Sequence, residues 1–400
     1  MPARPDAPAY FAHAATTPVR PEVVEVLVEQ LQRLGNPSSL HASGRQARRV
    51  VEESRETIAG ALGARPGDVV FTSGGTEADN LAVKGIASAR RAADPRRTRM
   101  LAPAIEHHAV LDSLEAMADQ GMQLELLEVD SVGRLDTAAL RAHVERDPDS
   151  IALVSCMWAN NEVGTVQPVG DVVQIARTHG IPVHSDAVQA VGVLPVDFDH
   201  SGLDALTVSA HKIGGPVGVG ALLVQRGAEV TPLLHGGGQE RQIRSGTLDA
   251  AGIAAFARAL EIAVGRRAEH HHTLEALRED LVRRVSAAVP EVLVNGDPRP
   301  DHRLPGIAHL SFPGCEGDSL LMLLDAAGIE CSTGSACTAG VPQPSHVLLA
   351  MGHDEDRARG SLRFSLGHTS TGADVDRLVA ALPGVVARAR DAGLLNRRVS

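Results

Sequence analysis

The feature that most constrains the fold is an alternation of short apolar runs with amphipathic stretches, which begins near residue 68. Several of the apolar runs are continuous rather than alternating, which is typical of strands buried on both faces of a parallel sheet. The stretches between them have helical spacing, so the pattern predicts an α/β domain with a mostly parallel sheet covered by helices. The expected strands lie at 68–72, 99–104, 151–158, 181–186, 205–210 and 219–224.

A second, smaller α+β domain is expected in the C-terminal third of the chain. At 400 residues the chain exceeds the size at which a single core usually stops growing. Residues 251–285 read as one long helix or two helices in series, and shorter strand signals follow at 291–296, 306–312 and 361–366. We therefore predict a large domain over residues 14–260 and a small domain formed by residues 1–13 and 261–400.

The charge and hydropathy of the chain exclude several classes of function. A net charge of −11 with neutral histidines gives no basic footprint for nucleic acid, so no such partner is expected. No apolar run reaches the roughly 18 residues of a transmembrane helix, and the first ten residues lack an apolar signal core. Four scattered cysteines make no disulfide framework, so a reducing cytoplasm is the expected setting.

Polar residues follow most of the predicted strands, and strand ends of an open α/β sheet gather at one ligand-binding edge. Small residues at 73–76 precede a helix whose first N–H groups could bind an anion, although a helix cap explains Thr76 equally well. Each other residue also has an ordinary structural interpretation, but the joint placement favours a site. These residues are Glu106, His107, His108, Asn160, Asn161, Glu162, Asp186, Gln189, Ser209, His211 and Lys212.

The chemistry that this set suits is that of pyridoxal phosphate. Lys212, at a strand end before Gly-Gly-Pro, can form a Schiff base, and a desolvated lysine with a lowered pKa is the usual form of that nucleophile. A carboxylate at another strand end can keep the pyridine nitrogen protonated, which makes the ring an electron sink. An imidazole can stack on the ring, and hydroxyl and N–H groups can bind the phosphate.

The sequence resembles the cysteine desulfurases of the NifS/IscS type, within the class V aminotransferase branch of fold-type I pyridoxal-phosphate enzymes. The matching segments occur in the family's order and span nearly the whole chain. A long loop around 330–342 distinguishes this subgroup from relatives with a shorter cysteine loop. The segments are AATTP (14–18), GNPSSLH (35–41), FTSGGTEADNLA (71–82), EHHAVLD (106–112), ANNEVGTVQP (159–168), HSDAVQAVG (184–192), SAHKIGGPVGVGAL (209–222), HGGGQERQIRSGT (235–247), STGSACTAG (332–340) and SLRFSLG (361–367).

The resemblance implies a role for each matching residue. Lys212 would form the Schiff base and move the substrate proton, and His107 would stack on the ring and assist proton transfer. Arg363 would bind the substrate carboxylate, aided by Asn161 and Asn36. Thr247 would reach the phosphate of a neighbouring subunit, which implies a homodimer. The implied cofactor-binding set is Gly75, Thr76, His107, Asn161, Asp186, Gln189, Ser209, His211, Lys212 and Thr247.

The implied reaction converts L-cysteine to L-alanine and transfers the sulfur to Cys337, the third catalytic residue, as a persulfide. The implied acceptor is a protein such as a scaffold for Fe–S cluster assembly, and a tRNA-thiolation protein is a further one. Two alternatives stay open. One is a selenocysteine lyase or another C–S lyase that uses no persulfide, and the other is a scaffold that only binds partners.

The remaining cysteines and histidines receive structural interpretations. Cys156 is expected in the core, Cys315 in a turn, and Cys331 buried at the root of the cysteine loop. The consecutive histidines at 270–272 are expected on a solvated helix face, and no metal site is expected. Ala12 stands where the resembling family usually has Asp, which leaves open the contacts of the N-terminal strand but not the cofactor set.

Overall fold

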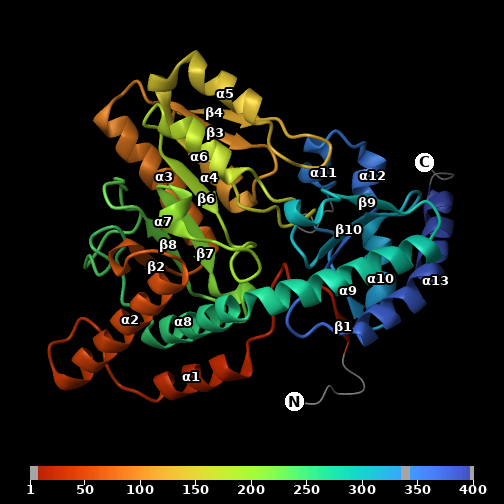
Figure 1. Cartoon of the computed structure of the whole chain (residues 1–400), viewed down its shortest axis with the longest axis horizontal. Coiled ribbons are helices and arrows are strands. Elements are labelled where there is room, and N and C mark those ends of the chain that lie inside the picture. Colours follow the sequence, from red (N-terminus) through yellow and green to blue (C-terminus); the bar gives the residue numbers. More distant parts are fainter. Residues whose placement is uncertain (1–7, 335–342, 397–400) are drawn as a thin grey trace.

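The computed structural model describes residues 8–334 and 343–396, which form two lobes (Figure 1). In the described residues the larger lobe contains a seven-stranded sheet with the order β2-β8-β7-β6-β5-β3-β4. The strands from β7 to β4 are parallel, and β8 runs antiparallel to both of its neighbours. Their bounds are β2 Val69–Thr72, β3 Arg99–Pro103, β4 Gln123–Leu127, β5 Ile151–Ser155, β6 Val183–Asp186, β7 Ala205–Ser209 and β8 Gly220–Val224. The predicted α/β architecture is confirmed.

Alternate residues of these strands pack into separate apolar clusters on the two faces of the sheet. In β2, Val69 and Phe71 join one cluster, and Val70 joins the other. In β3, Leu101 joins the first cluster, and Met100 joins the second. Burial on both faces explains why the strands appear as continuous apolar runs.

Helices cover both faces of the large sheet. The first cluster includes side chains from α2, α6 and α8, and the second includes side chains from α3 and α4. The helix bounds in this lobe are α1 Pro21–Leu31, α2 Ala42–Ala61, α3 Gly75–Ala93, α4 His108–Ala118, α5 Thr137–Arg146, α6 Val169–Arg177, α7 Phe198–Ser201 and α8 Ala250–Gly265.

The smaller lobe has its own apolar cluster, built around a three-stranded antiparallel sheet with the order β12-β10-β9. A two-stranded parallel sheet joins the N-terminal β1 to β11. The bounds are β1 Ala9–Tyr10, α9 Arg267–Ala288, β9 Leu293–Asn295, β10 Ile307–Ser311, α10 Gly317–Asp325, β11 Ile329–Glu330, α11 His346–Ala350, α12 Glu355–Arg359, β12 Ser361–Ser365 and α13 Gly372–Asn396.

Two features of the chain differ from, or refine, the sequence interpretation. The strand β4 was not expected, because its polar and charged residues give no continuous apolar run at this edge of the sheet. The long helical stretch is two helices, since Arg266 separates α8 from α9. The domain boundary remains a prediction. Ala263 belongs to the cluster of the larger lobe and Leu274 to that of the smaller lobe.

The N-terminal strand runs from the smaller lobe toward the larger one. Ala12 forms a parallel bridge with Ser365, and the Ala14 N–H donates to Ser365 Oγ at 2.9 Å. These contacts to the end of β12 hold the segment that carries Ala12 in place of the family's Asp. The segment therefore reaches the larger lobe with its backbone fixed.

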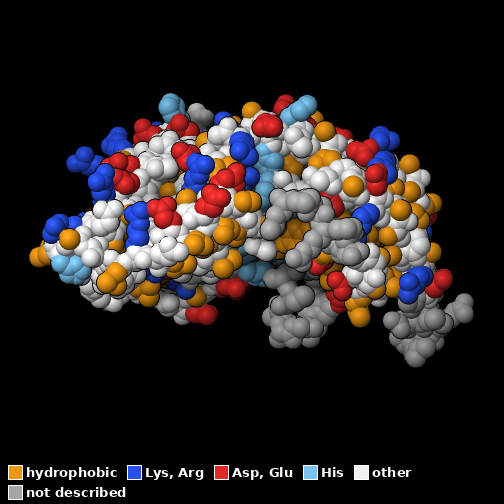
Figure 2. Space-filling view, turned by 90° about the horizontal axis from the view of Figure 1, so that it is seen from below, with side chains coloured by type: hydrophobic (Ala, Val, Ile, Leu, Met, Phe, Trp, Pro, Cys, Tyr) orange, Lys and Arg blue, Asp and Glu red, His pale blue; other side chains and the backbone are white. Residues whose placement is uncertain are grey.

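The surface carries interspersed charges rather than one basic region on the face shown in Figure 2. Positively and negatively charged side chains are scattered there among apolar ones. Within the described ranges, no helix combines the length and apolarity needed to cross a membrane.

Candidate active site

A cavity of about 400 Å³ lies at the carboxyl ends of the parallel strands, where side chains from both lobes meet. Most residues that the sequence predicts for the site line this cavity together. They are Gly75, Thr76, His107, Asn161, Asp186, Gln189, Ser209, His211, Lys212 and Arg363.

Lys212 follows the end of β7 and reaches the N-terminal segment. Its Nζ donates to the carbonyl oxygens of Ala14 at 2.5 Å and Ala15 at 2.7 Å. Burial, followed by the Arg363 charge, lowers the pKa of Lys212 to about 8 against the opposing effect of Asp186. A larger share of the amine is therefore neutral near neutral pH than for an exposed lysine, as a nucleophile or base requires.

Asp186 ends β6 and is buried in the same cavity. Its Oδ1 accepts a hydrogen bond from the Val188 N–H at 2.8 Å. Burial raises the pKa of Asp186 to about 6, against the effects of that hydrogen bond and of Lys212. Among the described residues this carboxylate forms no ion pair within 4 Å, and the Lys212 charge acts on it from a longer distance. A protonated heterocyclic nitrogen in the cavity would supply the missing charge partner.

An anion cradle lies where β2 turns into α3. The helix begins at Gly75, so the first N–H groups of α3 have no intrahelical acceptor. A Cβ at Gly75 would lie 3.2 Å from Val188 Cγ2, so a side chain there would crowd the cradle. Ser209 Oγ is buried and has no hydrogen-bond partner among the described residues. A phosphate fits this donor set.

His107 caps the N-terminus of α4. Its Nδ1 accepts a hydrogen bond from the Ala109 N–H at 3.1 Å, which leaves the proton of the neutral ring on Nε2. Burial, followed by the Lys212 charge, lowers the pKa of His107 to about 4. The ring is thus neutral at physiological pH and suited to stacking on a planar ligand.

Arg363 enters the cavity from β12 of the smaller lobe. It is 4 % exposed, and its Nη1 donates to the Asn161 carbonyl at 2.9 Å. Its Nε has no partner among the described residues. A buried guanidinium with free donors is suited to binding a carboxylate through two hydrogen bonds.

Two predicted site residues that the structure describes are not brought into the cavity. Asn36 is exposed, and its Oδ1 accepts from the Ser38 N–H at 2.9 Å. Thr247 is exposed on the loop before α8 and does not line the cavity of its own chain. Cys337 lies outside the described residues.

Other residues of the cavity were not assigned a role from the sequence. Asp79 on α3 is 1 % exposed and lies beside His184 at 3.6 Å, and the burial of Asp79, with the Asp186 charge, raises its pKa well above the usual range. Ser332 and His346 flank the cysteine loop, and His346 Nε2 lies 3.0 Å from the Glu106 carbonyl oxygen. In the sequence, Asp79 looks like an ordinary helix residue. Its place in the cavity follows only from the packing of α3 over the strand ends.

Of the described cysteines, Cys156 lies in the core as expected, Cys315 is more buried than a turn position suggests, and Cys331 is half-buried. Cys156 and Cys315 are buried, and Cys331 follows β11 against the apolar cluster of the smaller lobe. Burial raises the pKa of Cys331 to about 12, so its thiol is not activated.

The solvated face expected for the three consecutive histidines is wrong for His270. Its Nε2 is enclosed by protein where the residue lines a small cavity with the N-terminal segment, whereas His272 is exposed. In the part of the chain that the structure describes, no group of three metal-ligating side chains could hold a metal ion.

These residues fit pyridoxal phosphate. The phosphate cradle at Gly75, the unpaired carboxylate of Asp186 and the amine of Lys212 line one cavity. The neutral ring of His107 lines it too. The arrangement supplies an anion site for the phosphate, a carboxylate for the protonated ring nitrogen and an amine nucleophile. These are the groups that this cofactor requires from a protein.

Comparisons with known proteins agree with this assignment. Residues 9–378 match the family model described as Aminotransferase class-V. The chain is 56 % identical over 387 residues to an IscS-like cysteine desulfurase of Mycobacterium tuberculosis, with 96 % of this chain and 98 % of the relative covered. It is 41 % identical to the cysteine desulfurase IscS of Dictyoglomus turgidum, with 95 % of each chain covered. A solved NifS-like protein superposes with a TM-score of 0.88 at 36 % identity, covering 95 % of this chain and 99 % of that one.

Proposed function

This chain belongs to the class-V aminotransferase family, in its IscS/NifS-type cysteine desulfurase branch, and from that premise we propose how it acts. It converts L-cysteine to L-alanine with pyridoxal phosphate and transfers the sulfur to Cys337 as a persulfide. The observation that carries this proposal is the shared cavity of Lys212, Asp186 and Arg363, two residues of which have strongly shifted pKa values.

The residues of the cavity divide the work of binding and proton transfer. Arg363 and Asn161 bind the carboxylate of L-cysteine and so orient its Cα–H bond. The neutral Nζ of Lys212 takes the proton from Cα and returns a proton later. Asp186 provides the negative charge that favours a protonated ring nitrogen. Pyridoxal phosphate, when bound, supplies the electron sink that makes this proton acidic.

The sulfur transfer balances without an external oxidant. Cys337 Sγ, as a thiolate, bonds to the substrate sulfur while the substrate Cβ–S bond breaks. The substrate carbon skeleton is reduced to L-alanine, with a proton taken up at Cβ, and the Cys337 sulfur is oxidised to a persulfide. L-Cysteine and one thiol thus give L-alanine and one persulfide.

The persulfide supplies sulfur to acceptor proteins, of which an Fe–S assembly scaffold is the main one. A tRNA-thiolation protein is a further candidate acceptor. The support for a cytoplasmic setting is that the three described cysteines are unpaired.

A homodimer completes the site in this proposal. Thr247 is exposed and outside its own cavity, while its loop is anchored by the buried pair of Glu240 with Arg55 at 2.7 Å. Arg244 of the same loop pairs at 2.8 Å with Glu77 in the first turn of α3. This anchoring presents Thr247 outward, where it would contribute to the phosphate site of a second copy.

Mixed dimers test the contribution of Thr247. Subunits carrying Lys212→Ala and subunits carrying Thr247→Ala are combined, and activity is assayed at a cofactor concentration that leaves Thr247→Ala homodimers inactive. If Thr247 acts across the interface, one site of each mixed dimer is complete and activity returns. Activity that stays at the level of the separate variants would show that Thr247 acts within its own subunit.

The reaction itself is tested by stoichiometry. Holoenzyme incubated with L-cysteine is expected to form L-alanine and one persulfide per chain, located by mass spectrometry on Cys337. Cys337→Ser is expected to lose both, and Cys331→Ala is expected to retain both. Full-rate alanine formation by Cys337→Ser would instead assign the chain to lyases that use no persulfide, including selenocysteine lyase.

A further inference from the structure

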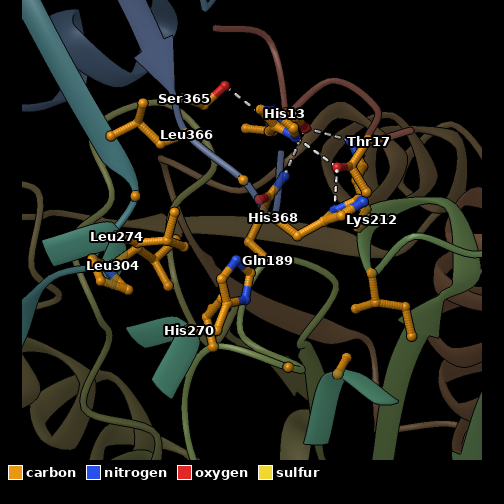
Figure 3. A pocket seen from close by; sticks show the side chains of 18 of the residues that line it. His13, Thr17, Gln189, Lys212, His270, Leu274, Leu304, Ser365, Leu366 and His368 are labelled. Carbon is orange, nitrogen blue, oxygen red and sulfur yellow. Dashed lines mark hydrogen bonds between the residues drawn. The ribbon is translucent and has the colours of Figure 1, made fainter. Parts of the chain in front are cut away.

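A second, smaller cavity of about 70 Å³ lies next to the active site (Figure 3). Lys212 and Gln189 line both cavities. The remaining polar wall comes from the N-terminal segment, from α9 and from the residues after β12. Figure 3 shows His13, Thr17 and His368 close together, with His270 on another side of the same space. No step of the proposed reaction uses this cavity.

Arg20 lines the cavity and forms no ion pair within 4 Å among the described residues. The side chain belongs to a residue that is 8 % exposed, and its Nε donates to the Ile213 carbonyl at 3.3 Å. Among the described residues, its terminal nitrogens hydrogen-bond to no acceptor, and no carboxylate lies within 4 Å. The nearest acid along the chain, Glu22, pairs with Arg266 at 3.8 Å instead. Glu22 acts on Arg20 only from beyond ion-pair distance, so an anion in the cavity would be a closer charge partner.

The three histidines add potential donors and no negative charge. Burial lowers the pKa of His13 and His270 to about 4 and that of His368 to about 3, so all three are neutral near pH 7. The Arg20 charge contributes to the shifts of His270 and His368. The Glu22 charge opposes the downward pKa shifts of Arg20 and His368, but it is the smallest of the effects on His368. The cavity wall itself therefore carries positive charge without a carboxylate, and an anion would favour proton uptake by these rings.

Some polar side chains of this wall hydrogen-bond to one another, and at least one has no partner among the described residues. His13 Nδ1 lies 2.6 Å from Thr17 Oγ1, which lies 3.4 Å from His368 Nδ1. The His270 Nε2 atom is enclosed and has no partner among the described residues. A Cβ at Gly367 would lie 2.1 Å from His13 Nδ1, so glycine at this position is what allows the ring to pack there.

We propose that this cavity binds a small inorganic oxyanion, with Arg20 as its charge partner and Thr17 and His368 as neighbouring hydrogen-bonding groups. A volume of about 70 Å³ holds about five water-sized positions, which suits an anion of about five non-hydrogen atoms. The same volume is too small for pyridoxal phosphate. The anion would stand next to Lys212, yet it is distinct from the phosphate group of the cofactor, which has its own cradle at Gly75.

The location is tested with the holoenzyme, whose phosphate cradle is already filled. Crystals soaked in selenate are expected to show an anomalous peak beside Arg20. Calorimetric titration with sulfate, at constant ionic strength, is expected to show one binding event per chain in solution. A selenate peak without binding in solution would mean an adventitious ion only and would overturn the proposal, as would the absence of a peak.

Matched variants test the residue assignment. Arg20→Gln is expected to weaken sulfate binding at least tenfold. Arg283→Gln removes an equal charge from an exposed position on α9, and is expected to change binding less than twofold. Equal losses in the two variants would overturn the proposal, because binding would then follow surface charge. If Arg20→Gln does not fold, Thr17→Val replaces it, and unchanged sulfate affinity in that variant counts against the site.

Discussion

Two buried polar regions, one within the larger lobe and one at the cavity between the lobes, differ in how completely their polar atoms are hydrogen-bonded. Glu240 accepts from Arg55 Nη1 and Nη2 at 2.8 and 2.7 Å and from the Phe71 N–H at 2.8 Å. Arg55 also donates to the Val69 carbonyl at 2.8 Å. In the active-site cavity and next to it, several buried atoms have no partner among the described residues. These atoms are Asp79 Oδ1, Glu106 Oε2, Ser185 Oγ, Ser209 Oγ and Arg363 Nε.

The difference separates polar groups that stabilise the fold from groups that serve a ligand. A buried polar atom without a partner costs free energy, and a folded protein keeps few of them. Several in one place indicate that the ligand completes the hydrogen bonds. The Arg55–Glu240 pair needs no ligand, and its role is to hold the loop that carries Thr247.

The largest effect on activity is expected from Lys212→Ala, because this variant lacks the amine that removes the proton from Cα of the substrate. We expect alanine formation from L-cysteine to fall by roughly 10³-fold or more, since a positioned acid–base group typically contributes about 10²–10⁴-fold. Lys84 is the only other lysine in the chain, so Lys84→Ala is the matched control and should retain activity. Reduction of the holoenzyme with borohydride and peptide mapping should label Lys212. A label on Lys84 would contradict the assignment.

Glu240→Ala should show the next largest effect, on stability. The variant leaves the Arg55 charge buried and unpaired, so the free energy of unfolding should fall by about 3–5 kcal/mol in denaturant titrations. Glu53→Ala removes the partner of Arg49 in an exposed pair of similar length, 2.7 Å, and should cost less than about 1 kcal/mol. Similar losses in the two variants would erase the distinction between the buried pair and a surface pair.

Ser209→Ala should separate cofactor affinity from stability. Its hydroxyl has no protein partner, so the apoprotein should unfold at an unchanged or slightly higher denaturant concentration, while the dissociation constant for pyridoxal phosphate should rise about tenfold. Ser155→Ala is the converse control. Its hydroxyl lies 2.9 Å from His184 Nδ1, so that variant should lose stability and keep its cofactor affinity. The opposite pattern would place Ser209 in the structural group.

The effect of Glu106→Gln is expected to be smallest near pH 4.5 and to grow as the pH rises toward 8. Burial raises the pKa of Glu106 from 4.5 to about 8. The stability that its protonated form contributes is fully present below about pH 4.5 and is lost as pH rises through about 8. Glutamine has no such dependence, so the variant should gain stability relative to the wild-type protein between pH 5 and 8.5. If denaturant titrations show a constant difference in the free energy of unfolding between variant and wild type from pH 5 to 8.5, the raised pKa of Glu106 is ruled out.

Much of the site could be predicted from the sequence, because each strand end is marked by a short local pattern of residues. The runs that end at Asp186 and Ser209 are apolar and then polar, and the parallel order of the strands brings them together. Asp79 could not be found in this way, since its burial depends on how α3 packs over the sheet. The single-chain structure also places Thr247 and Asn36 outside the cavity, which a list of matching motifs does not reveal.

The carbonyl groups that accept hydrogen bonds from Lys212 belong to Ala14 and Ala15, near the start of the chain. The strand that pairs with this N-terminal segment, β11, lies near the end of the chain. Ala9 pairs with Ile329, so these contacts close over a separation of some 320 residues. A ribosome therefore releases the N-terminal segment long before its partners exist. We expect nascent chains that stop before residue 300 to leave Lys212 without this clamp, which labelling of its amine during stalled translation would reveal. The amine of Lys212 therefore reaches its final environment only after β11 has been synthesised.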